Sequence, residues 1–128
     1  MGGLFAFVDS QYRIEIDGEE YFIDILLYHR SLKCLVAIEL KIGKFMPEYV
    51  GKMQFYLAVL DDKARMHGET APIGIILCKS KNNTIVEYAL KESNKPIGIA
   101  TYRIMSKLPK NLQGKLPSPE QIAKLMKE

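Results

Sequence analysis

The sequence contains little cysteine and little histidine. The residues of these two types are Cys34, Cys78, His29 and His67, and they form no C-x-x-C pair and no close histidine pair. We therefore do not expect a zinc site. Both cysteines stand inside apolar runs, which is typical of buried free thiols in a reducing compartment.

Long apolar runs and targeting signals are also missing. No apolar run approaches the about 20 residues that span a bilayer, and no basic segment precedes the apolar stretch LFAFV near the N-terminus. We expect a soluble, cytoplasmic protein without a membrane partner. Because a domain seldom begins on its core, the stretch at 4–8 predicts either an excised fragment or an edge strand.

The composition indicates one globular domain. Hydrophobic residues make up 48% and charged residues 26% of the 128-residue chain. Residues 1–78 hold 8 basic and 11 acidic side chains, whereas residues 79–128 hold 10 basic and 4 acidic ones, so the net charges are −3 and +6. The basic second part predicts either a surface that binds a polyanion or a solvated lysine-rich surface.

The periodicity of the apolar residues predicts an α/β fold. Alternation, followed by the tight-turn pair Asp17-Gly18 and two apolar runs, predicts three strands in a meander. The expected elements are strands at 11–17, 20–28, 33–41, 73–78 and 97–104, and helices at 48–63, at 85–91 and from Ser118. This order predicts an α+β mixed sheet with a crossover helix and flanking helices. The core is expected at 1–104, with a C-terminal loop and helix at 105–128.

Three charged residues interrupt the second and third predicted strands. Asp24, Glu39 and Lys41 stand in apolar surroundings, where an unpaired charge is strongly unfavourable. Glu39 and Lys41 share a face because side chains two apart in a strand point the same way. The two compatible turn centres, Ser31-Leu32 and Arg30-Ser31, place Asp24 opposite or diagonal to the second carboxylate. Both registers therefore gather the two carboxylates on one face.

This set of residues suggests phosphodiester chemistry. Two carboxylates on one face repel each other, and a hard divalent cation relieves the repulsion. Mg²⁺ takes one or two carboxylates and leaves positions open for phosphate oxygens, while Lys41 suits orienting or deprotonating a water or neutralising the transition state. The sequence has no G-x-x-x-x-G-K loop and no Ser, Cys or His nucleophile arrangement. The other interpretation is a strand-end salt bridge between Lys41 and one of the carboxylates.

The same residues carry a family resemblance. A strand with an embedded aspartate, a hairpin, a strand that ends Glu-x-Lys and an immediate helix resemble the PD-(D/E)XK nuclease superfamily. From about Phe5 to Tyr102, the chain resembles the C-terminal nuclease domain of bacterial YhcG-like proteins. The matching phrases are YFIDILLYHRSLKCLVAIELKIGKFMPEYVGKMQFYL, IGIILCKSKNNTIVEYAL and NKPIGIATY.

The resemblance implies a restriction-endonuclease-like core and a nuclease that acts on DNA. It implies that Asp24 and Glu39 hold Mg²⁺, with Mn²⁺ as a substitute, and that the Leu40 carbonyl is a third ligand. Lys41 is then the catalytic lysine, and Gln54 on the following helix is a further site residue.

Additional contacts and partners follow from the resemblance. Tyr28 and Tyr56 are candidate DNA contacts or core aromatics, and Gln11 is an additional site candidate. The lysines that suit phosphate contacts are Lys79, Lys81, Lys91 and Lys95. A homodimer is expected by analogy with nucleases that cut both strands. The YhcG-like proteins also have an N-terminal half, so an N-terminal domain absent from this chain is expected. Many superfamily members carry an acidic residue on a helix before the first strand, and no such helix precedes LFAFV in this sequence. The alternative function is a non-catalytic nucleic-acid-binding or protein-assembly module on the same fold.

Overall fold

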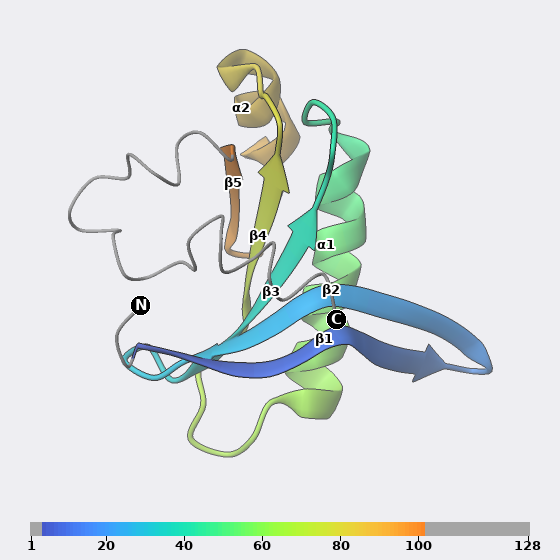
Figure 1. Cartoon of the computed structure of the whole chain (residues 1–128), viewed down its shortest axis with the longest axis vertical. Coiled ribbons are helices and arrows are strands. Elements are labelled where there is room, and N and C mark those ends of the chain that lie inside the picture. The colour runs from blue at the N-terminus through green and yellow to red at the C-terminus, as the bar shows by residue number, and fades with distance from the viewer. Residues whose placement is uncertain (1–3, 102–128) are drawn as a thin grey trace.

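Five strands and two α-helices make up the structure, a computed structural model that describes residues 4–101 (Figure 1). They are β1 (Phe5–Ile16), β2 (Glu19–His29), β3 (Cys34–Leu40), α1 (Glu48–Val59), the π-helical turn η1 (Leu60–Ala64), β4 (Ile73–Cys78), α2 (Asn83–Lys91) and β5 (Ile97–Thr101). The strands form one sheet in the order β1-β2-β3-β4-β5, antiparallel from β1 to β3 and parallel from β3 to β5. The predicted mixed α/β sheet, with its three-strand meander and crossover helix, is confirmed. The segment 105–128, with its expected helix from Ser118, lies outside the described residues.

The first strand is longer than the sequence predicted. It begins at Phe5 instead of Gln11 and continues through a bulge between Phe7 and Asp9. The polar residues after the bulge interrupt the apolar pattern, but β2 pairs with β1 on both sides of it. The stretch at 4–8 is therefore part of the edge strand of the sheet.

The register between β2 and β3 selects one of the two predicted turn centres. Leu26 pairs with Ala37, which centres the turn on Ser31-Leu32. At the end of this turn Lys33 adopts a positive φ of 55°, and its amide donates to the carbonyl oxygen of His29 at 2.7 Å. This closure of the turn holds the register on which the geometry of the charged residues depends.

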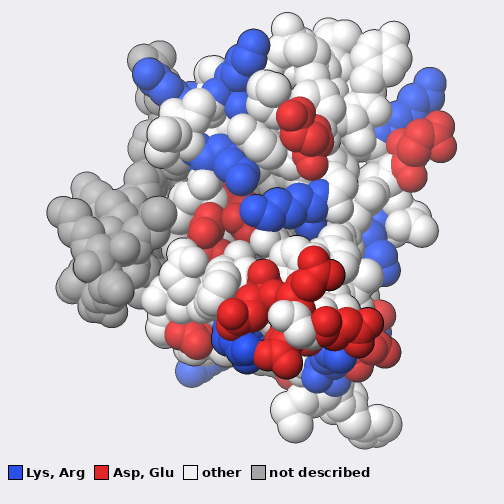
Figure 2. All heavy atoms as spheres, turned by 90° about the vertical axis from the view of Figure 1, so that its right-hand side faces the viewer, with Lys and Arg blue, Asp and Glu red and all other residues white. Residues whose placement is uncertain are grey.

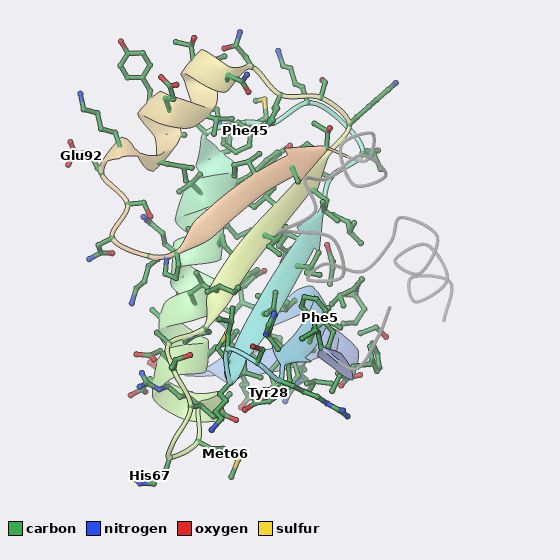
Figure 3. All side chains as sticks on the ribbon, turned by 90° about the vertical axis from the view of Figure 1, so that its left-hand side faces the viewer. Phe5, Tyr28, Phe45, Met66, His67 and Glu92 are labelled. Carbon is green, nitrogen blue, oxygen red and sulfur yellow. The ribbon has the colours of Figure 1, made fainter. Side chains whose placement is uncertain are left out.

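Each face of the sheet carries its own hydrophobic cluster. Both helices pack on one face, where Met53, Tyr56 and Leu57 of α1 are at most 1% exposed. The opposite face gathers Phe5, Ile25, Leu27, Cys34, Val36, Ile38, Ile75 and Leu77. Figure 3 shows α1 and Phe5 on opposite sides of the strands. The central strand β3 is thus covered on both faces, as its continuous apolar run predicted.

The two cysteines are buried and free, as predicted. Burial raises the pKa of the thiols of Cys34 and Cys78, which keeps both in the neutral form at neutral pH. Neither helix within residues 4–101 combines the length and the apolar character needed to cross a membrane.

Close contact between α1 and β4 depends on Gly74. A Cβ atom at this position would lie 2.6 Å from both Cγ and Sδ of Met53 and 3.3 Å from Cδ1 of Leu57. We expect Gly74→Ala to lower the free energy of unfolding by about 1–3 kcal/mol, because overpacking displaces the helix or forces poor rotamers. Gly98→Ala in β5 is the matched control, since no atom lies within 4 Å of its added Cβ. Equal urea midpoints for the two variants would contradict this account of the packing.

Candidate active site

Asp24 and Glu39 lie opposite each other on the face of the sheet that α1 covers. The ladder between β2 and β3 ends with Ile25 paired to Ile38, and one step further along the same register sets Asp24 across from Glu39. The backbone amide of Leu40 donates to Oδ2 of Asp24 at 2.9 Å. The structure therefore brings together the two carboxylates that the sequence singled out, and it ties the Leu40 peptide to them.

Gln11 of β1 supports Asp24 from the other side. Its Nε2 donates to Oδ1 of Asp24 at 3.2 Å. Gln11 also has a φ of 51°, a left-handed conformation that is uncommon for a residue other than glycine and costs about 1 kcal/mol. Such a conformation persists only where the surrounding structure holds the residue in place. The additional candidate Gln11 is thus part of the carboxylate cluster.

Glu39 is almost completely buried, and this decides its charge. The residue is 4% exposed, and its Oε1 has no hydrogen-bond partner within the described residues. Burial raises the pKa of the Glu39 carboxyl to about 8, and the hydrogen bond with Asp24 and the Asp24 charge act in the same direction. Near pH 7, without a cation, the Glu39 carboxyl is therefore mostly protonated.

Lys41 follows directly after β3, on the strand that carries Glu39. Its Nζ lies 4.6 Å from the ring centroid of Tyr49 on α1, and its amide donates to the carbonyl oxygen of Leu77 at 2.8 Å. The Lys41 charge also lowers the pKa of Glu39. The backbone of Lys41 is therefore fixed by its hydrogen bond to β4, and its ammonium group lies over the ring of Tyr49 in the first turn of α1.

Lys52 is a second cation at the carboxylate pair, and the sequence interpretation missed it. Its Nζ lies 5.6 Å from the ring centroid of Tyr56, one helical turn further along α1. The Lys52 charge acts more strongly than that of Lys41 in lowering the pKa of Glu39. Tyr49, Lys52 and Tyr56 share one helix face because they are three and four residues apart. That spacing, directly after the Glu-x-Lys strand, was the signal available in the sequence.

The remaining predicted site residues differ in where they lie. Tyr56 is 1% exposed and its hydroxyl donates to the carbonyl oxygen of Phe22 at 3.3 Å, so it is a core aromatic that borders the carboxylates. Tyr28 packs partly buried against the cluster under α1. Gln54 is two residues from both Lys52 and Tyr56, which places it about 200° around the helix from them. Its predicted role at the site, like the Leu40 carbonyl ligand, stays a prediction.

The donor set suits a hard cation. Within residues 4–101 no group of three or more His, Cys, Asp or Glu side chains is placed to hold a metal ion. Mg²⁺ needs only one or two carboxylates, because water and phosphate oxygens complete its shell. The orphaned Oε1 of Glu39, beside Asp24, is the kind of buried oxygen that such an ion satisfies. The residues present therefore fit Mg²⁺.

Comparison with known proteins identifies the family of this chain. The family model described as the YhcG PDDEXK nuclease domain matches residues 1–117. The chain belongs to this family. "Putative nuclease YhcG" of Escherichia coli (strain K12) is 39% identical over 90 residues, covering 70% of this chain and 24% of that protein. The chain thus spans about a quarter of the length of this relative.

Two solved structures resemble the chain at low sequence identity, and the first of them shows the same fold. The structure described as an EndoMS-dsDNA2 complex matches with a TM-score of 0.56 and 16% identity, covering 76% of this chain and 36% of that one. A repair endonuclease from Pyrococcus abyssi matches with a TM-score of 0.49 and 18% identity, covering 74% and 37%. The family match and the likeness at a TM-score of 0.56 show the restriction-endonuclease-like fold that the resemblance implied.

Proposed function

We propose that this chain is a metal-dependent nuclease domain that hydrolyses DNA phosphodiester bonds. The observation that carries the proposal is the pair formed by the half-buried Asp24 and the buried Glu39. One carboxylate oxygen of Glu39 has no hydrogen-bond partner within the described residues, and the ammonium groups of Lys41 and Lys52 lie over aromatic rings of α1 beside the pair. Membership of a nuclease-type domain family supports it. The nuclease name of the E. coli relative and the DNA complex of the structural neighbour point to the same substrate class.

Each residue of the cluster has a distinct role in the proposed reaction. Asp24, Glu39 and the Leu40 carbonyl would hold Mg²⁺ or Mn²⁺, and a bound ion of this kind lowers the pKa of water and stabilises charge on a phosphate. Gln11 and the Leu40 amide keep the Asp24 carboxylate oriented through their hydrogen bonds. Lys41 directly follows the C-terminal end of β3. In the proposed reaction it orients the attacking water or neutralises the negative charge that develops on the phosphate in the transition state.

The experiment that tests the proposal combines a metal titration with a cleavage assay. Calorimetry should show Mg²⁺ or Mn²⁺ binding accompanied by proton release, because Glu39 is mostly protonated near pH 7 in the metal-free protein. Cleavage of duplex and single-stranded DNA should require the same cation and stop with a chelator. A folded protein that binds DNA but binds no cation would instead indicate the non-catalytic binding module.

The two lysines should differ in their contributions to cleavage. We expect Lys41→Ala to lower kcat by about 10²–10⁴-fold, the range for a group that transfers a proton or stabilises the transition state. Lys52→Ala should lower it by about 10–100-fold, because Lys52 acts on the charge and orientation of the Glu39 ligand. Lys63→Ala in η1 is the control, since this exposed lysine follows the adjacent acids Asp61 and Asp62. Full activity of Lys41→Ala would remove Lys41 from the proposed mechanism.

Homodimerisation, an N-terminal domain and cytoplasmic location stay predictions. The match covers 24% of the E. coli relative, so the activity proposed here is that of this domain and not of a longer protein that contains it.

A further inference from the structure

Two loops that are far apart in the sequence join at the carboxyl ends of the parallel strands. The loop after β3 and the loop after β4 form an isolated bridge between Lys44 and Ser80. The amide of Lys79 donates to the carbonyl oxygen of Gly43 at 2.9 Å, and the amide of Phe45 donates to that of Ser80 at 2.8 Å. Residues 41–45 and 79–82 therefore form one continuous surface, which we call the strand-end edge.

The strand-end edge carries positive charge without carboxylates of its own. Lys44 and Lys79 are exposed, and Lys41 and Lys81 are partly exposed. The Nζ of Lys81 reaches the carbonyl oxygen of Ile99 at 3.5 Å. This surface begins at Lys41, so it continues directly from the carboxylate pair of the candidate active site.

Most of the acidic side chains lie elsewhere, although exposed Glu48 at the start of α1 follows the loop after β3 by three residues. The tip of the β1–β2 hairpin and the turn η1 hold Glu15, Asp17, Glu19, Glu20, Asp61 and Asp62. Figure 1 shows the hairpin tip and η1 away from the ends of β3 and β4 that precede these loops. Figure 2 shows most acidic spheres in a band across the lower half of the molecule, with several basic side chains above it. A polyanion at the active site is thus repelled from one side and attracted toward the strand-end edge.

An exposed apolar side chain stands among these lysines. Ile42 is 94% exposed, the highest value among the exposed large hydrophobic residues of the described chain. It follows Lys41 directly and is separated from Lys44 by one glycine. Apolar side chains at nucleic-acid interfaces pack on sugars and bases, next to basic groups that contact phosphates.

We propose that the strand-end edge binds the nucleic acid on one side of the scissile phosphate. Lys44, Lys79 and Lys81 contact backbone phosphates, and Ile42 packs against a sugar or a base. This inference rests on the proposed nuclease function and deepens it, because it gives the direction in which the substrate leaves the active site. A nucleic acid fits the edge better than an acidic protein does, since the basic row begins at the lysine beside the proposed metal ligands.

The test is the salt dependence of DNA binding, measured without divalent cations so that no cleavage occurs. A short fluorescently labelled DNA duplex is titrated with protein at several salt concentrations, and the slope of log K against log salt is compared between variants. Each lost phosphate contact should reduce the magnitude of the slope by about 0.9. The double variant Lys44→Ala/Lys79→Ala should therefore reduce it by about 1.8 and weaken binding at low salt.

Two further variants separate the apolar contact from the charges. Ile42→Ala should weaken binding by about 3–10-fold without a change in slope, because no counterion is released by an apolar contact. The double variant Arg30→Ala/Lys63→Ala removes the same charge as the lysine pair of the edge, from the turn after β2 and from η1. It should leave the slope of the wild-type protein nearly unchanged.

The outcomes distinguish this inference from the nuclease proposal. If wild-type protein cleaves DNA but Lys44→Ala/Lys79→Ala keeps its slope and affinity, the strand-end edge is not the binding surface, and the nuclease proposal stands. If wild-type protein never cleaves but the slopes change as expected, the edge binds nucleic acid and the nuclease proposal fails. Binding to polyglutamate, with no binding to duplex or single-stranded DNA at low salt, would overturn the inference in favour of an acidic protein partner.

Discussion

Glu39→Gln is expected to lower DNA cleavage by at least about 10³-fold, because it removes one of the two carboxylates proposed to hold the metal ion. The substitution keeps the size and shape of a side chain that is 4% exposed, so the packing under α1 is retained. Asp24→Asn should have an effect of the same order, since the amide keeps one oxygen for its hydrogen bonds but loses the charge. The measurement is the single-turnover rate of cleavage at saturating Mg²⁺.

Matched controls test whether the loss of cleavage comes from the carboxylate pair or from the loss of any one negative charge. Glu92→Gln at the C-cap of α2 and Asp62→Asn in η1 make the same substitutions at exposed positions. Both controls should cleave at the wild-type rate. Circular dichroism and Mg²⁺ calorimetry on the two site variants should show an intact fold and weakened metal binding. Wild-type cleavage by Glu39→Gln would show that the carboxylate pair is not the reaction centre.

The metal-free protein is expected to lose stability as the pH rises from about 4.5 to about 8. The folded-state pKa of Glu39 is raised from 4.5 to about 8 by burial and by Asp24. Between these values the folded state binds more protons than the unfolded state, so the free energy of unfolding falls with rising pH. A shift of this size corresponds to at most about 5 kcal/mol, and the expected total fall is about 2–4 kcal/mol.

Glu39→Gln and Mg²⁺ provide the two controls for this pH dependence. The glutamine does not titrate, so the variant should show a flatter profile and exceed wild type in stability at pH 8 in the presence of a chelator. Mg²⁺ should restore stability to the wild-type protein most strongly at high pH, because it binds the ionised carboxylate. Urea unfolding at a series of pH values measures both effects. Parallel profiles for wild type and Glu39→Gln would mean that Glu39 is ionised in the metal-free fold.

The sequence by itself determined the order of the strands, the first helix and three charged residues of the candidate site, Asp24, Glu39 and Lys41. These features leave local signals, since a strand alternates or is apolar throughout and a helix repeats every three to four residues. Asp24 and Glu39 stood out because each interrupts an apolar run, and strand parity then placed both on one face. Placing both carboxylates on one face required no contact between distant segments, because β2 and β3 are joined by one short turn.

The tertiary structure decided what depends on packing between distant segments. It chose the Ser31-Leu32 turn centre, carried β1 through its bulge to Phe5, and brought Gln11 to Asp24. The raised pKa of Glu39 requires α1 and the sheet to close over the carboxyl group. Lys52 gains its place beside that group only because the crossover helix packs on β3. The basic strand-end edge likewise forms only because the loops after β3 and β4 pair with each other, although α1 and β4 separate these loops in the sequence.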